Sequence, residues 1–178
     1  MFQAVNGSGK TGAFVVPSLM RVDTSINKPQ VIILANTREL IRQTLEVMKV
    51  LGSETNIKLA LGEAGQVDLT SHILITVPGY LKNKLVARKI DLDLSELKCI
   101  VYDEADELFV QHTNHDCFEV LKKHLKKIDK NPQHCLYSAT YNNDIVNKTT
   151  QFVGTFQSFN IPKESLKLKG VKNFKLKK

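Results

Sequence analysis

A short glycine-containing stretch near the start of the chain has the composition of a phosphate-binding turn. It runs Ala4-Val5-Asn6-Gly7-Ser8-Gly9-Lys10-Thr11. Glycines let successive backbone N–H groups of such a turn point inward and form an anion-binding nest. A lysine and a threonine that end the turn supply a positive charge for phosphate and a hydroxyl for Mg²⁺. We therefore predict a nucleotide site at Asn6, Gly7, Ser8, Gly9, Lys10 and Thr11; the alternative is a Gly/Ser-rich turn that happens to precede Lys-Thr.

Two adjacent carboxylates form the second candidate. Asp103 ends an apolar run, where a charged group is costly unless it has a partner. A Mg²⁺ ion shared with Thr11 would be that partner, bound directly or through water. Glu104 is the next residue and would point in a different direction, so it could orient a water for in-line attack on a γ-phosphate. The alternative is an acidic first turn of a helix, which favours Asp and Glu in any case.

The elements that must position these residues follow a regular alternation. Apolar, β-branched runs predict buried strands at 31–34, 73–76, 99–102 and 135–137, with weaker candidates at 58–61 and 158–161. Apolar residues at helical spacing predict helices over 38–51 and over 118–128. We interpret the lysines of the second helix as a solvated face. The pattern predicts a parallel sheet with helices on both faces.

Polar signatures come directly after four of these strands. Asn36-Thr37-Arg38-Glu39 follows the first, Val77-Pro78-Gly79 the second, Asp103-Glu104-Ala105-Asp106 the third and Ser138-Ala139-Thr140 the fourth. The carboxyl ends of parallel strands share one edge of the sheet, and ligands bind there. We therefore expect all four loops to meet the phosphate-binding turn along that edge.

Charge and cysteine content bear on whether the domain has a basic face, a disulfide or a zinc site. The chain has 178 residues and a net charge of +7, but residues 163–178 hold seven Lys and one Glu, which leaves only +1 for the rest. This is the pattern of a basic tail rather than of a basic domain face. The three cysteines are scattered, which argues for a reducing compartment and against a zinc site. We interpret 111–117, with its two His and one Cys, as a surface loop.

No apolar run approaches the roughly 20 residues of a membrane span, so we expect no membrane association.

In this order and spacing, the signatures resemble those of the first RecA-like domain of a DEAD-box RNA helicase. They are Ala4–Thr11, Thr37-Arg38-Glu39-Leu40, Pro78-Gly79, Asp103–Asp106 and Ser138–Thr140. Ala4 stands where the general phosphate-loop pattern has Gly, and this variant is the helicase form of the loop. The resemblance covers nearly the whole chain. It implies an α/β, RecA-like P-loop NTPase domain whose activity is ATP-driven RNA duplex opening or RNA–protein remodelling.

The resemblance also implies residue roles. Lys10 and Thr11 would hold phosphate and Mg²⁺, Asp103 would hold Mg²⁺ through water, and Glu104 would be the general base. Coupling of ATP state to RNA binding would fall to Asp106, Ser138, Ala139 and Thr140. The RNA backbone would be bound, without sequence preference, by Thr37, Arg38, Glu39, Pro78 and Gly79. ATP and Mg²⁺ would be the cofactors.

Residues 1–162 correspond to the first helicase domain, with its amino-terminal part, including the adenine-reading segment, missing. Residues 163–178 are similar to an interdomain linker, most of all in the mRNA-export branch that acts at the nuclear pore, with the translation-initiation branch as the close alternative. The second RecA-like domain has no counterpart, so we expect a truncated helicase half. Its partners would be RNA, that second domain and export or translation factors, in the cytoplasm or nucleus.

Departures from the family pattern concentrate in the RNA elements. Val77 and Tyr80 stand where the family has Thr and Arg, and Thr76, one position early, could substitute for the lost hydroxyl. We expect weaker RNA binding as a result. Two other functions stay open: a remnant that binds RNA or protein without turnover, and a P-loop ATPase with no RNA partner.

Overall fold

The computed structural model describes residues 1–4, 7–63, 67–87 and 92–160. Within them, strands and helices alternate as the sequence predicts. The strands are β1 (Phe2–Gln3), β2 (Val31–Leu34), β3 (Leu59–Gly62), β4 (Ile73–Thr76), β5 (Cys99–Asp103), β6 (Gln133–Ser138) and β7 (Phe159–Asn160). The helices are α1 (Lys10–Met20), α2 (Arg38–Leu51), α3 (Pro78–Val86), α4 (Ala105–Val110), α5 (His112–Lys127) and α6 (Asn143–Val153).

The described strands form a seven-stranded parallel sheet in the order β3-β4-β2-β5-β6-β1-β7. Leu34, the last residue of β2, is in register with Thr76 of β4 and with Tyr102 of β5. One residue further along β5, Asp103 is in register with Tyr137 of β6. The carboxyl ends of the central strands therefore lie level along one edge, which confirms the predicted parallel sheet.

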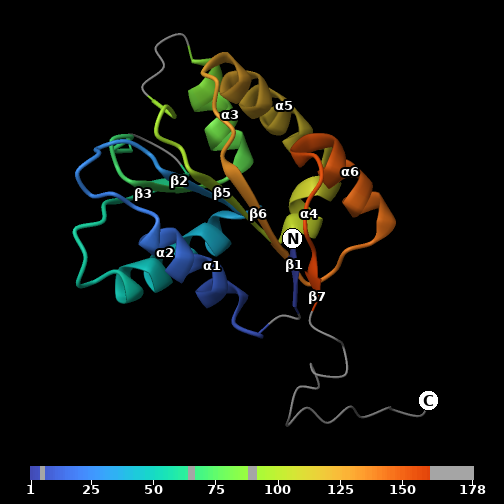
Figure 1. Cartoon of the computed structure of the whole chain (residues 1–178), viewed down its shortest axis with the longest axis horizontal. Coiled ribbons are helices and arrows are strands. Elements are labelled where there is room, and N and C mark those ends of the chain that lie inside the picture. Colours follow the sequence, from blue (N-terminus) through green and yellow to red (C-terminus); the bar gives the residue numbers. More distant parts are fainter. Residues whose placement is uncertain (5–6, 64–66, 88–91, 161–178) are drawn as a thin grey trace.

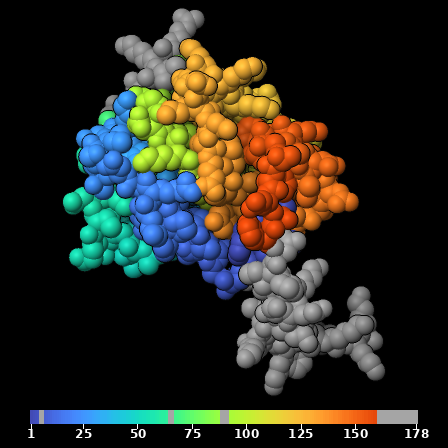
Figure 2. Space-filling view, viewed as in Figure 1, coloured from blue at the N-terminus to red at the C-terminus, as the bar shows by residue number. Residues whose placement is uncertain are grey.

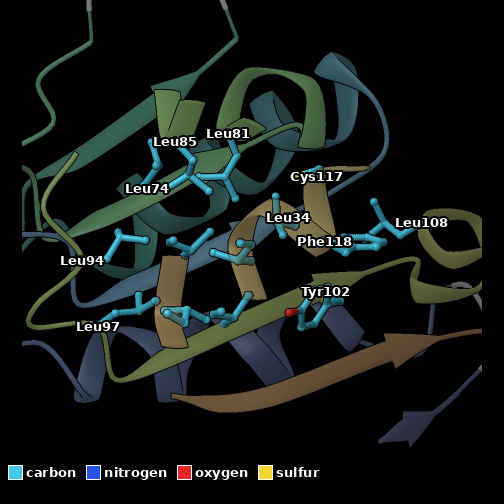
Figure 3. Packing of buried hydrophobic residues seen from close by; sticks show 14 of the residues in the cluster. Leu34, Leu74, Leu81, Leu85, Leu94, Leu97, Tyr102, Leu108, Cys117 and Phe118 are labelled. Atoms are coloured by element: carbon cyan, nitrogen blue, oxygen red, sulfur yellow. The ribbon is translucent and has the colours of Figure 1, made fainter. Parts of the chain in front are cut away.

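Helices cover both faces of this sheet (Figure 1). Helices α1 and α2 pack together on one face, over a core that includes Phe14, Ile33 and Met48. Helices α3, α4, α5 and α6 cover the other face, where Leu34, Leu74, Leu81, Leu85 and Phe118 converge (Figure 3). The four residues of β2 are fully buried, as the continuous apolar run predicts for a strand covered on both sides.

An aromatic cluster fills the second face near β5. The rings of Phe109 and Phe118 stack with centroids 4.7 Å apart, and Tyr102 packs against both. The Tyr102 hydroxyl lies 2.9 Å from Nδ1 of His134 on β6. Burial lowers the pKa of His134 to about 4, so the imidazole is neutral at physiological pH. The contact with the Tyr102 hydroxyl is therefore one between two uncharged groups.

The surface loop predicted for 111–117 is wrong, because α5 begins at His112. The apolar stripe of this helix starts earlier than the sequence suggested, since the side chain of Cys117 is only 1% exposed and packs with Phe118. The Asn114 amide fixes the first turn by donating to the carbonyl of Leu108 at 3.1 Å and to the Asn36 side chain at 3.3 Å. Among the described residues there is no cluster of three His, Cys, Asp or Glu that could hold a metal.

The two weak strand candidates form the two edge strands of the described sheet, β3 and β7. β3 pairs with β4, and the two-residue β7 pairs with the equally short β1. β1 is thereby inserted between β7 and β6. The linker predicted at residues 163–178 lies outside the described residues. No helix in the described ranges has the length and apolar character needed to cross a membrane.

Close packing at Gly62 gives a stability prediction. A Cβ atom at this position would lie 2.5 Å from the Thr76 hydroxyl and 2.8 Å from the Tyr80 ring. We expect Gly62→Ala to destabilise the fold by about 1–3 kcal/mol, measured by urea unfolding, because β3 and β4 must separate to admit the methyl group. Gly12→Ala is the matched control: no atom lies within 4 Å, so it should be neutral or stabilising by up to about 1 kcal/mol. Equal effects of the two substitutions would contradict the packing argument.

Candidate functional site

The glycines of the phosphate-binding turn adopt backbone conformations that other residues rarely reach. Gly7 has φ of 78° and Gly9 has φ of 90°. Gly9 is also the residue before the first turn of α1, so the helix starts inside the turn. Free N–H groups at a helix N-terminus and a positive dipole end favour anions. These features agree with the predicted phosphate-binding role of Gly7, Ser8 and Gly9, which stays a prediction; Val5 and Asn6 lie outside the described residues.

Lys10 is held against the sheet. Its side chain is 9% exposed, and its ammonium donates to the carbonyl of Ala4 at 2.8 Å. The amide of Ala4 in turn donates to the carbonyl of Ser138 at 3.0 Å. Two hydrogen bonds thus join the lysine, the start of the turn and the end of β6. Thr11 follows in the first turn of α1.

The adjacent carboxylates differ in burial and in backbone conformation. Asp103 ends β5 and is 7% exposed. Glu104 has φ of 51° and ψ of 52°, a left-handed conformation uncommon outside glycine, and its amide donates to the Asp103 carboxylate at 3.1 Å. Such strain persists only where the surrounding structure imposes it. Here the left-handed residue lies between the buried end of β5 and the start of α4.

Burial raises the pKa of Asp103, and the positive charge of nearby Lys10 partly offsets this. Burial also raises the pKa of Glu104, with a further contribution from the negative charges of Glu107 and Asp103. The site thus holds two carboxylates that are disfavoured as anions and one cation that is near both.

Mg²⁺ fits this donor set. The ion prefers oxygen ligands and is usually held by one or two protein groups together with nucleotide phosphates. The buried carboxylate of Asp103 and the hydroxyl of Thr11 are such groups, and a cation would relieve the desolvation that raises the pKa of Asp103.

A hydrogen-bonded bridge connects the end of β6 to the start of α4. The fully buried Ser138 hydroxyl donates to the carbonyl of Thr140 at 2.9 Å and accepts from the amide of Thr140 at 3.2 Å. The Thr140 hydroxyl donates to the Asp106 carboxylate at 2.5 Å. The side-chain amide of Gln3 donates a hydrogen bond to the carbonyl of Ala139 at 3.2 Å. The structure therefore brings together all the residues to which the sequence assigned coupling.

The residues assigned to RNA lie after the neighbouring strands β2 and β4. Thr37 is the residue before α2, where its hydroxyl accepts from the amide of Leu40 at 3.2 Å. Arg38 and Glu39 are exposed on the first turn of that helix. Pro78 is buried at the first position of α3, and Gly79 beside it is exposed. These residues share the edge of the sheet with the phosphate-binding turn.

The suggestion that Thr76 replaces the missing threonine hydroxyl is wrong. Its side chain is fully buried and donates to the carbonyl of Gly62 at 2.6 Å. The alternation of side chains along a strand explains this, because a residue one position earlier points to the opposite face.

Two further contacts at this edge escaped the sequence analysis. Gln3 supports Ala139 across 136 residues of sequence. Arg42 forms an ion pair with Glu63, with Nε and a terminal nitrogen 3.2 and 3.0 Å from one carboxylate oxygen. Neither had a signal in the sequence, since both depend on long-range proximity.

The family profile of DEAD/DEAH box helicases matches residues 1–148. The chain is 32% identical over 184 residues to DEAD-box ATP-dependent RNA helicase 38 of Arabidopsis thaliana, with 98% of the chain and 37% of the relative covered. It is 35% identical over 175 residues to ATP-dependent RNA helicase DBP5 of Lodderomyces elongisporus (96% and 33%) and 32% identical over 183 residues to eukaryotic initiation factor 4A of Cryptosporidium parvum (97% and 43%). The chain thus spans less than half the length of these relatives.

Solved structures agree with the fold. Saccharomyces cerevisiae Dbp5 bound to RNA and ADP BeF3 superposes with a TM-score of 0.80 at 29% identity, covering 97% of this chain and 44% of that one. The same yeast protein, as an L327V variant bound to Nup159, Gle1 H337R, IP6 and ADP, gives a TM-score of 0.78 at 31% identity, covering 90% and 42%. A RecA-like domain is therefore confirmed.

The buried carboxylate gives a prediction for the protein without nucleotide. The pKa of Asp103 is raised in the folded state, so its contribution to stability falls as pH rises from the unfolded value of 3.8 through the folded value. We expect Asp103→Asn to increase the free energy of unfolding at pH 7 by roughly 0.5–2 kcal/mol, and the gain to shrink below pH 4. Asp116→Asn is the control with the opposite sign, because an exposed ion pair with Lys82 lowers the pKa of Asp116. A loss of stability in Asp103→Asn at pH 7 would refute this account.

Proposed function

Because the chain belongs to the DEAD/DEAH box helicase family, we propose that it is the nucleotide-binding half of an ATP-dependent RNA helicase. The observation that supports this most directly is the meeting of Lys10, Asp103 and Ser138 at one edge of the sheet, linked through Ala4 and the carboxyl ends of β5 and β6. Such a helicase hydrolyses ATP and uses the cycle to open short RNA duplexes or to remodel RNA–protein complexes.

In this proposal the phosphate-binding turn holds the triphosphate. Gly7, Ser8 and Gly9 direct backbone N–H groups at the phosphates, and the N-terminus of α1 adds its dipole. Lys10 moves from the carbonyl of Ala4 to the β- and γ-phosphates, where its charge stabilises the transition state. Thr11 and Asp103 hold Mg²⁺, which neutralises phosphate charge and polarises the γ-phosphoryl group when it is bound.

Glu104 acts as the general base. Its raised pKa brings the carboxylate closer to the operating pH, where a base is most effective in accepting a proton. Its left-handed backbone separates it from the metal-binding Asp103, so one residue can orient the attacking water while its neighbour holds the ion.

The bridge from Asp106 through Thr140 to Ser138 couples the two functions. Asp106 lies in the first turn of α4, two residues after the general base, and Ser138 ends β6. A change in the position of the phosphates and metal would pass through Asp103 and Glu104 to this bridge. The hydrogen bonds from Thr140 would then be kept or broken according to nucleotide state.

RNA binds through Thr37, Arg38, Glu39, Pro78 and Gly79 by contacts to phosphate and sugar, without sequence preference. We expect RNA binding to be weaker than in the family because Val77 and Tyr80 replace a hydroxyl and a cation. This reduction is also the observation that favours the second candidate, a module that binds RNA or protein without turnover.

The finer assignments rest on the relatives. We assign residues 1–162 to the first helicase domain and 163–178 to a basic linker toward a second domain. The likeness to Dbp5 bound to RNA, Nup159 and Gle1 supports the mRNA-export branch, and hence a nuclear and cytoplasmic protein, while the likeness to initiation factor 4A supports the translation branch.

Two substitutions separate nucleotide binding from hydrolysis. In the protein that contains this chain, Glu104→Gln should retain nucleotide affinity but lower RNA-stimulated ATP turnover by about 10²–10⁴-fold, because the general base is lost. Lys10→Ala should weaken nucleotide binding by at least about tenfold through loss of the charge on the phosphates. Phosphate release and nucleotide titration measure the two effects. Glu119→Gln, an exposed glutamate on α5, is the control; full turnover in Glu104→Gln would exclude the assigned role.

RNA binding is tested on the exposed arginine. We expect Arg38→Gln to weaken single-stranded RNA binding for all sequences and to lower the slope of log K against log salt by about 0.7, the value for one phosphate contact. Fluorescence anisotropy at several salt concentrations measures both. Lys123→Gln on α5 is the control, since that helix face should be solvated. If Lys123→Gln has the larger effect, the RNA-binding face has been assigned to the wrong side.

A further inference from the structure

Two cysteines that the proposed function does not use lie against each other in the sheet. Cys99 begins β5, Cys135 lies in β6, and their sulfur atoms are 3.8 Å apart. Cys99 is 3% exposed, whereas Cys135 is only partly buried. Both belong to the face of the sheet that α1 and α2 cover. One thiol is therefore sealed in the core and the other lies at its boundary.

Cys135 is among the residues that line a cavity of about 470 Å³. β5 pairs with β6 at Cys135, but β1, on the other side of β6, pairs with it only at Tyr137 and Ser138, so within the described residues no strand lies beside Cys135 on that side. Residues of β6, of β1 and of the segment 153–159 line the space. Figure 2 shows the orange residues of β6 and the red residues that follow α6 side by side on one surface. Because Cys135 lines this space and is only partly buried, we infer that a small disulfide can reach its sulfur from this side.

Charge and hydrogen bonding favour the thiolate of Cys135. The Cys99 thiol donates to the Cys135 sulfur, and this hydrogen bond lowers the pKa of Cys135, with a further contribution from the positive charge of Arg21. Arg21 is anchored nearby, because its guanidinium donates to the side chain of Gln133. The third cysteine differs: Cys117 is 1% exposed, and burial raises its pKa to about 12.

We propose that Cys135 is a modification site, a reactive thiol that forms mixed disulfides with small disulfides such as oxidised glutathione. The Cys135 thiolate attacks one sulfur of the small disulfide, and the bond between its two sulfurs breaks. The other half leaves as a thiolate and takes up a proton. The Cys135 sulfur is oxidised and the departing sulfur is reduced, so the exchange needs no further reagent.

The geometry also indicates that Cys99 activates its neighbour without resolving the adduct. Cys135 is in register with Val101, two residues beyond Cys99. A strand spacing of about 4.8 Å and a two-residue offset of about 6.6 Å place the two α-carbons about 8 Å apart. A disulfide requires less than about 7 Å. The mixed disulfide therefore persists until an external thiol reduces it.

Labelling of the native protein tests the site without nucleotide or RNA, so its outcome is independent of the proposed function. The whole chain is incubated with oxidised glutathione, and adducts are located by peptide mass spectrometry. We expect the first adduct at Cys135, reversed by dithiothreitol and absent in Cys135→Ser. The rate should rise with pH with a midpoint below about 8.5, the value for a free cysteine. First labelling at Cys117 or Cys99, or a midpoint of 8.5 or above, would overturn the proposal.

Variants of the neighbouring thiol test the activation. Cys99→Ala should slow Cys135 labelling at pH 7 roughly tenfold, because the hydrogen bond to the thiolate is lost. Cys99→Ser keeps a hydroxyl donor and should stay within a few-fold of the parent, and Cys117→Ala should change nothing. Labelling of Cys117 in the same sample corrects for unfolding, since a loosened core would expose both thiols. An unchanged ratio of Cys135 to Cys117 labelling in Cys99→Ala would overturn the assigned role of Cys99.

Discussion

Parallel pairing of buried strands in a fixed register is the constraint on which the site depends. Leu34, Thr76 and Tyr102 lie level across β2, β4 and β5, and Asp103 lies level with Tyr137 of β6. Because the strands are buried on both faces, a slip of one residue would move every side chain of the strand to the opposite core, where it would not fit the packing. The loops that follow the strands are therefore held at one edge by the packing of the whole domain, and short polar sequences far apart in the chain become neighbours.

At that edge, backbone hydrogen bonds do as much positioning as side chains. Ala4 accepts from the Lys10 ammonium and donates to Ser138, while Gln3 holds Ala139. Gln3 of β1 and the adjacent Ala4 thus connect the phosphate-binding turn to the bridge that reaches Asp106. The same edge also carries two destabilising features, the desolvated carboxylate of Asp103 and the left-handed backbone of Glu104 at the end of β5. This is the pattern expected where function competes with folding.

The sequence predicted the elements whose local signals agree with their packing. Helix α2 begins and ends where the apolar period places it, and all four strong strand candidates form. It failed where a tertiary contact decides. The first turn of α5 is fixed by the Asn114 amide and the burial of Cys117, and Thr76 is turned inward by the alternation of β4. Residue types and spacing predicted which side chains share the edge, whereas their roles in hydrolysis and RNA binding stay predictions.

The position of β1 has a consequence for synthesis of the protein. This strand is made first, yet its partners lie at residues 137–138 and 159–160. At about 5–20 residues per second, the ribosome needs on the order of ten seconds or more to produce them. Strands β2 to β5 can pair with one another during that interval, but the carbonyl of Ser138, to which the Ala4 amide donates, is not yet present to fix the start of the turn. The nascent chain therefore acquires its central sheet early and its ability to hold a nucleotide last.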